Sequence, residues 1–238
     1  MGHPQGRPAW QTIGWLVAVF AGWLTCAGPA PAQARTPPDS SLAAAHHRNE
    51  TLLGVAAPLE DLVRFAEQRD TNGVDQSIAD IQGQVGQVIP ELKPDARRGF
   101  EARLDELGRA RRRADLAAAG MAAVEAYRTV ILSLDASALT IPVQVDELSY
   151  ASLKAELLTD GKPYHWTELV AVAAQADRDW RRLRGTVQND GLRRLMHVAL
   201  TSLNQAAQTK NASMAHCAAH FTDAAVAVLQ QQYLLLRQ

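Results

Sequence analysis

The sequence predicts an all-α fold, an antiparallel helical bundle of about five to six helices. After residue 41, apolar residues recur every three or four positions along most of the chain, which is the spacing of one helix face. Clusters of Gly, Pro and polar residues separate these periodic segments, as expected of short connections. No long alternation of apolar and polar residues, the pattern of half-buried strands, interrupts them. Helices joined by short loops pack side by side in opposite directions.

The first 34 residues have the pattern of a secretory signal peptide that is cleaved after Ala34. Arg7 precedes an apolar run from Ile13 to Ala27, and "GPAPAQA" supplies a small-residue ending. The run is shorter than the ~20 residues that a membrane span requires. We therefore expect export to the periplasm of a bacterium, and no transmembrane segment in the mature chain.

The mature chain is expected to begin with a flexible segment, residues 35–41, followed by a helical-bundle domain over residues 42–238. Pro58 is expected to interrupt the first helical segment, because proline lacks a helix donor. The next helix shows alternating steps of four and three between its apolar residues, the seam of a packed helix, and ends at Pro90; these residues are Val74, Ile78, Ile81, Val85 and Val88.

One long central helix is predicted over about residues 95–134. Pro94 suits a helix start, and apolar residues then recur three or four apart as far as Leu134. A helix of about 40 residues would be roughly 60 Å long. Such a rod would join two sub-bundles, residues 42–134 and 147–238.

A short extended connection is predicted near residues 139–146, where β-branched residues surround Pro142. A short helix follows, as far as about Leu158. Two further seams, over residues 166–187 and 192–206, predict two helices, and the last helix is expected from about Ala212 to Leu235.

The charge balance excludes a nucleic-acid-binding domain. The chain has 24 Lys and Arg against 25 Asp and Glu, and the signal peptide removes only Arg7. A phosphate-binding domain would show a strong basic excess or a basic face. The one basic run, Arg109–Arg113, is interpreted as a solvated helix face with an Asp105–Arg109 pair one turn apart.

The cysteines allow no disulfide within the mature chain. Cys26 is interpreted as an ordinary signal-peptide residue and not as a lipidation site, because Trp23, Leu24 and Thr25 fit a lipidation signal poorly. Cys217 is then the single cysteine of the mature chain. In an oxidising compartment it must be buried, bound to a metal or bridged to another molecule.

The last helix carries the one candidate metal site, in "NASMAHCAAHFTD", residues 211–223. His216, His220 and Asp223 stand at i, i+4 and i+7, so they share one helical stripe, and two imidazoles one turn apart can bind the same ion. The opposite face is expected to pack against the bundle; its residues are Met214, Cys217, Ala218, Phe221, Ala225 and Val228. Without a metal, the same histidines are incidental surface residues.

Further candidate ligands are scattered along the chain: His46, His47 and His197. They would complete the site only if folding brought them beside His216. His165 and Glu168 have an H-x-x-E spacing that is similar to that of the iron-linked imelysin-type periplasmic proteins; the similarity covers four residues, and we assign no family on them. Asn211 begins an N-x-S sequon, but we interpret it as a helix cap.

These observations favour an exported, non-catalytic binding, scaffold or accessory module. No nucleophile motif, phosphate loop or C-x-x-C pair stands in the sequence. The expected partner is a protein of the cell envelope or a second copy of the chain. The alternative is a periplasmic protein that binds a transition metal, Zn, Cu, Ni or Fe, because imidazole and carboxylate suit all four.

Overall fold

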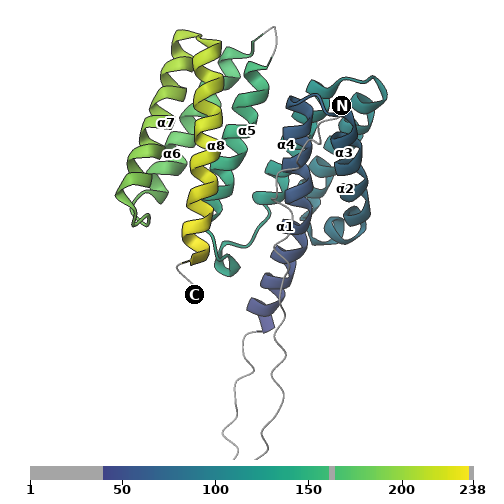
Figure 1. The fold of residues 1–238 in the computed structure, drawn as a ribbon. Helices are drawn as coiled ribbons and strands as arrows, with labels where there is room; N and C mark the ends of the chain where they lie inside the picture. The colour runs from purple at the N-terminus through teal and green to yellow at the C-terminus, as the bar shows by residue number, and fades with distance from the viewer. Residues whose placement is uncertain (1–39, 161–163, 236–238) are drawn as a thin grey trace, which may run out of the picture. The chain divides into compact units, whose positions relative to one another are not determined.

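A computed structural model describes residues 40–160 and 164–235 of the chain. Within them lie eight α-helices, one short 3-10 turn and no strand (Figure 1), which confirms the all-α class. The helices are α1 Ser40–Glu67, α2 Thr71–Glu91, α3 Pro94–Arg112, α4 Leu116–Ile131, α5 Val143–Thr159, α6 Trp166–Leu183, α7 Asp190–Thr209 and α8 Ala212–Leu235, with the turn η1 at Ala136–Ala138.

The prediction of one helix over residues 95–134 is wrong, because the chain breaks between α3 and α4. Ala114 has a φ of 54°, the left-handed conformation, which ends α3. Asp115 then caps α4, its Oδ1 accepting a hydrogen bond from the Ala118 N–H at 3.0 Å. The chain folds back and packs α4 against α3. This break brings the number of helices above the expected five to six.

Two other boundaries differ from the sequence-based expectation. Pro58 lies inside α1, which continues past it to Glu67. The extended connection is shorter than residues 139–146, because only residues 139–142 lie between η1 and α5. Pro142 is the N-cap of α5, a position that needs no backbone donor.

The eight helices form two groups of four around two hydrophobic cores (Figure 1). In the first group α1 packs against α2 and α4, and α4 also packs against α3; in the second, α8 packs against α5 and α7, and α6 packs between α5 and α7. Helix α5 contributes to both cores, with Tyr150, Leu153 and Leu157 in the first and Val145, Leu148 and Leu158 in the second.

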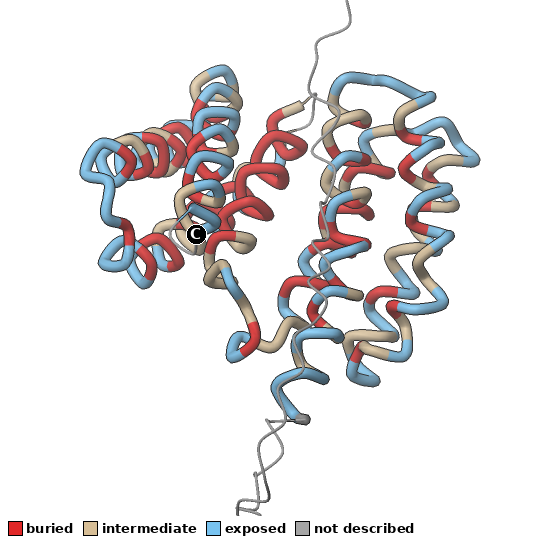
Figure 2. The backbone as a smooth tube through the Cα atoms, turned by 60° about the horizontal axis from the view of Figure 1, so that its bottom comes forward, coloured by how far each residue is buried: buried red, intermediate tan, exposed pale blue. Residues whose placement is uncertain are grey.

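Helix α5 is therefore enclosed on nearly all sides, and thirteen of its seventeen residues are buried (Figure 2). It has no polar face, so Ser149, Ser152, Lys154 and Glu156 are buried with its apolar residues. Buried polar groups need partners from neighbouring helices. The polar residues of α5 thus determine what α1, α4, α6 and α8 must present to it.

Helix α8 has the predicted bounds but not the predicted packing face. Its buried residues are Ala215, Ala218, Ala219, Thr222, Ala225, Val226 and Leu229. Cys217, Phe221 and Val228, which were expected to pack inward, are exposed. The helix is apolar on most of its circumference, so the hydrophobic pattern alone does not fix which side faces the core.

The proposed signal peptide, residues 1–34, lies outside the described residues, as does most of segment 35–41. Helix α1 begins at Ser40, inside that segment. The division into residues 42–134 and 147–238 stays a prediction. None of the described helices has the length and apolar character needed to cross a membrane.

We predict that Asp115→Ala lowers the free energy of unfolding by about 1 kcal/mol, because the first turn of α4 loses its cap. Urea unfolding followed by circular dichroism measures the change. Asp105→Ala, an exposed acidic residue within α3, is the control and should change stability by no more than about 0.5 kcal/mol. Equal effects of the two substitutions would contradict the capping role.

Candidate metal centre

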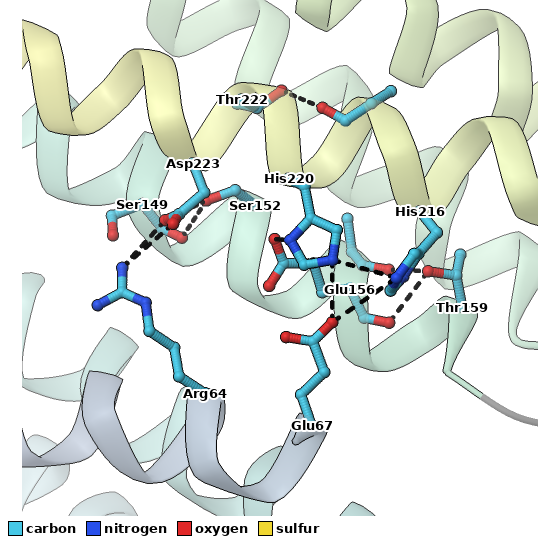
Figure 3. A network of polar contacts seen from close by, with 12 residues as sticks. Arg64, Glu67, Ser149, Ser152, Glu156, Thr159, His216, His220, Thr222 and Asp223 are labelled. Atoms are coloured by element: carbon cyan, nitrogen blue, oxygen red, sulfur yellow. Dashed lines mark hydrogen bonds and ion pairs between the residues drawn. The ribbon is translucent and has the colours of Figure 1, made fainter. Parts of the chain in front are cut away.

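The candidate site lies where α1, α5 and α8 meet, and each helix contributes polar residues to it (Figure 3). Glu67 ends α1, Glu156 lies in the last turn of α5, and His216 and His220 lie in the first half of α8. Asn211 starts α8, because its Oδ1 accepts a hydrogen bond from the Met214 N–H at 3.1 Å. This confirms Asn211 as a helix cap and fixes the histidines one turn inside the helix.

Three ligand-type atoms converge at the centre of the site. The Nε2 atoms of His216 and His220 are 3.1 Å apart. Oε1 of Glu67 lies 3.2 Å from Nε2 of His220 and 3.9 Å from Nε2 of His216. Among the described residues, these three form the one group of His, Cys, Asp and Glu side chains whose ligand atoms lie close enough together to hold one ion. Figure 3 shows Glu67 reaching from α1 toward both imidazoles.

Glu156 lies behind the histidines and is almost completely buried, with 2% of its surface exposed. Its Oε1 is 2.9 Å from Nδ1 of His220, although the N–H direction does not complete a hydrogen bond, and the oxygen has no other partner in the described part of the chain. Burial, together with the neighbouring carboxylates of Glu67 and Asp223, raises the pKa of Glu156 to about 9. Near neutral pH Glu156 is therefore protonated, and Glu67 is the acidic residue that faces both imidazoles.

A second buried atom is also unsatisfied. Nδ1 of His216 has no hydrogen-bond partner among the described residues, while Nε2 of the same ring faces Glu67 and His220. Leaving buried polar atoms unpaired costs about 1–3 kcal/mol each. Unpaired buried atoms of this kind call for an explanation, and an ordered water or a bound ion nearby is one.

Asp223, the third residue of the predicted stripe, has a different partner. Both of its carboxylate oxygens accept hydrogen bonds from Nη2 of Arg64, at 3.2 and 3.3 Å, and Oγ of Ser152 lies 3.5 Å away (Figure 3). Helix α1 therefore presents a cation to Asp223 and a carboxylate to the histidines, one turn apart. The structure places Glu67, and not Asp223, beside the two imidazoles.

The further candidates from the sequence lie elsewhere. His46 and His47 are exposed near the start of α1, about 30 Å along the helix from Glu67. His197 is exposed on α7 and lines a separate surface pocket with Trp180 and Arg184. None of these histidines belongs to the cluster.

His165 and Glu168 lie at the start of α6 and line a different groove, of about 590 Å³. Glu168 forms an ion pair with Lys154 at 2.6 Å, and Lys154 also pairs with Glu125 of α4. Lys154 has 6% of its surface exposed, so these two carboxylates compensate a buried charge. Of the two residues with the H-x-x-E spacing, Glu168 thus has an ion-pair role here.

The sequence analysis missed Glu67, Glu156 and Arg64. One signal could have indicated Glu156: it stands with Lys154 in "LSYASLKAELL", where the surrounding residues are apolar on every side of a helix. Charged residues in such a helix are buried and need partners. Glu67 has no comparable signal, because it lies in an ordinary polar helix end.

Acidic residues continue along the α1–α5 contact away from the metal centre. Ser149 Oγ donates a hydrogen bond to Glu60 of α1 at 3.0 Å, and Tyr127 of α4 donates to the carbonyl of Asp146 at 3.4 Å. Burial, together with repulsion from Glu60 and Glu147, raises the pKa of Asp146 to about 7. Burial also raises the pKa of Glu60.

The pKa of Asp146 predicts a pH dependence of stability. The folded state binds the Asp146 proton up to about pH 7, whereas the unfolded state releases it near pH 4, so stability falls as pH rises between these values. Asp146→Asn should match wild type near pH 4 and exceed its free energy of unfolding by about 1–3 kcal/mol at pH 8. Urea unfolding at both pH values checks this. Asp105→Asn is the exposed control. If wild type were more stable than Asp146→Asn at pH 8, burial of the ionised Asp146 carboxylate would not be destabilising, and the prediction would be wrong.

Comparisons of the chain with protein-family models, with curated proteins and with solved structures find no match.

Proposed function

We propose that the chain binds a divalent transition metal ion through Glu67, His216 and His220. The observation that carries this proposal is the spacing of the three ligand atoms. A tetrahedral ion with bonds of about 2.1 Å holds its ligand atoms about 3.4 Å apart. The distances of 3.1, 3.2 and 3.9 Å lie around that value, so an ion fits at their centre with small side-chain movements.

The surroundings of the His220 imidazole support the proposal. Metal-binding histidines almost always direct their second ring nitrogen at a carboxylate or carbonyl, which fixes the tautomer. Glu156 Oε1 stands 2.9 Å from Nδ1 of His220, on the far side of the ring from Glu67. A proton on Nδ1 leaves the Nε2 lone pair of His220 free to bind the ion.

The donor set narrows the choice of metal. Two imidazoles and one carboxylate suit Zn, Cu, Ni and Fe. The near-tetrahedral spacing of the ligand atoms favours Zn(II), because Zn(II) has no electronic preference for another geometry and is usually tetrahedral in proteins. Three protein ligands leave one coordination position for water or for a ligand from another molecule. We propose metal binding or delivery in the periplasm, after export, as the role, and not catalysis.

The direct test is titration of the full chain, without a histidine tag, with Zn(II) in a calorimeter. One equivalent per chain should bind to wild type, and His216→Ala/His220→Ala should abolish this binding, because both nitrogen ligands are lost. The matched control is His46→Ala/His47→Ala, an adjacent pair of exposed histidines in α1, which should bind as wild type does. Equal binding by the two double variants, or no binding by wild type, would remove the proposal.

A second pair of variants tests which carboxylate is the ligand: Glu67, which the structure places beside the histidines, or Asp223, which the sequence pattern suggested. Glu67→Gln should weaken Zn(II) binding at least tenfold, because it removes a ligand charge 3.2 Å from His220. Asp223→Asn should change the affinity less than threefold, because Asp223 pairs with Arg64. The reverse order of effects would show that Asp223, as the sequence suggested, is the ligand.

Glu156→Gln should lower Zn(II) affinity 10–100-fold, the usual effect of losing a partner that orients a histidine ligand. The same calorimetric titration measures it. Glu50→Gln, an exposed glutamate of α1, is the control for a lost charge. Wild-type affinity in Glu156→Gln would leave the three ligands in place but remove the supporting role of Glu156.

A non-catalytic scaffold remains the second candidate function. It is favoured by a separate observation, the large apolar side chains that α8 exposes, Phe221, Val228, Leu234 and Leu235. Such residues on one helix face indicate contact with another molecule.

A further inference from the structure

The outward side of α8 is apolar and carries no charge. We call the nine exposed residues between positions 217 and 235 the outer face; they are Cys217, His220, Phe221, Ala224, Ala227, Val228, Gln231, Leu234 and Leu235. Phe221, Val228, Leu234 and Leu235 each expose half or more of their surface. Asp223, the one Asp, Glu, Lys or Arg in this stretch, is turned to Arg64 on the inner side.

The outer face has the repeat of a coiled-coil seam. Phe221, Val228 and Leu235 are spaced by seven, and Cys217, Ala224 and Gln231 form a second series with the same spacing. Together they alternate steps of four and three, which places six residues in one stripe along the helix. A seam of this kind is normally covered by another helix.

A groove lies beside the carboxyl-terminal half of the seam. It has a volume of about 490 Å³ and is lined by the start of α7 and by four residues of α8, namely Val228, Gln231, Gln232 and Leu235. Phe221, the large exposed side chain of the seam, lies about 15 Å from Gln231 along the helix. Phe221 can act as a knob and the groove as the hole that receives it. Both lie along the seam of α8, toward opposite ends of it.

We propose that two copies of the chain pair through their outer faces, with the two α8 helices antiparallel. A two-fold axis between Ala224 and Val228 places Phe221 of each copy opposite Gln231 of the second copy, in that copy's groove. It also places Ala224 opposite Val228 and Cys217 opposite Leu235. Such an interface is closed, because each copy supplies the same knob and the same hole.

Area and charge agree with a second copy as the occupant. Covering the outer face would remove from water the exposed surface of nine residues, four of which are large apolar side chains that are half or more exposed. No like charges meet when an uncharged face pairs with itself, whereas a charged partner would find no complementary group there. The inference stands independently of metal binding.

Sedimentation of the mature chain, residues 35–238, over a range of concentrations tests the pairing. Wild type should sediment as a dimer at micromolar concentration, and Phe221→Ser should shift it to the monomer or weaken dimerisation at least tenfold. Val198→Ser on α7 is a closely matched control, because Val198 is 58% exposed and Phe221 is 57% exposed. Monomeric wild type, or equal loss of the dimer in both variants, would overturn the proposal.

The orientation is tested by oxidation. In the antiparallel pair, Leu235→Cys should give a covalent dimer through Cys217 and the new thiol of the second copy, while wild type should give none. A disulfide needs Cα atoms about 4.4–6.8 Å apart, which opposite seam positions provide. A covalent dimer of wild type through two Cys217 residues would show a parallel pair and overturn the proposed arrangement.

A lipid surface is the competing occupant of an uncharged apolar face. Sedimentation with vesicles of zwitterionic lipid distinguishes the two. If wild type stays monomeric without vesicles and binds them, and Phe221→Ser does not bind, the outer face is a membrane contact and the dimer proposal falls. None of these variants changes Glu67, His216 or His220, so the three proposed metal ligands are present in all of them.

Discussion

The burial of α5 between two hydrophobic cores is the constraint on which the rest of the structure depends. Thirteen of its seventeen residues are buried, so its polar side chains are shielded from water. They therefore need hydrogen-bond or ion-pair partners from the surrounding helices. Lys154 forms ion pairs with Glu125 and Glu168, and Ser149 donates a hydrogen bond to Glu60. Glu156, by contrast, faces the imidazole of His220 and lies near the carboxylate of Glu67.

This difference separates a structural network from a candidate site. The Lys154 cluster pairs one buried cation with two carboxylates and leaves no buried atom of these groups unsatisfied in the described part of the chain. The Glu156 cluster leaves Oε1 of Glu156 and Nδ1 of His216 unpaired. The Glu156 cluster also contains the three converging ligand-type atoms of Glu67, His216 and His220, and for that reason we propose different roles for the two clusters, although both are built on α5.

The sequence predicts the helices better than it predicts their faces. Periodicity locates α6, α7 and α8, since the core-facing residues of these segments repeat regularly. It misses the break at Ala114, because the apolar repeat continues through a turn that depends on one left-handed residue and one cap. It also places the wrong side of α8 inward, because that helix is apolar on both sides.

The candidate site shows the same limit. Spacing within α8 brings His216 and His220 together, and this local part of the site follows from 3.6 residues per turn. The third group comes from α1, 149 positions before His216, and no local pattern relates Glu67 to the histidines or separates it from Asp223. Only the packing of α1 and α8 around α5 decides between the two carboxylates.

X-ray absorption spectroscopy of the Zn(II)-loaded protein tests the metal centre most directly. The structure predicts nitrogen and oxygen ligands at about 2.0–2.2 Å, with the outer-shell scattering of two imidazoles. A sulfur ligand at about 2.3 Å, which would come from the exposed Cys217, or fewer than two imidazoles, would contradict the Glu67, His216 and His220 centre.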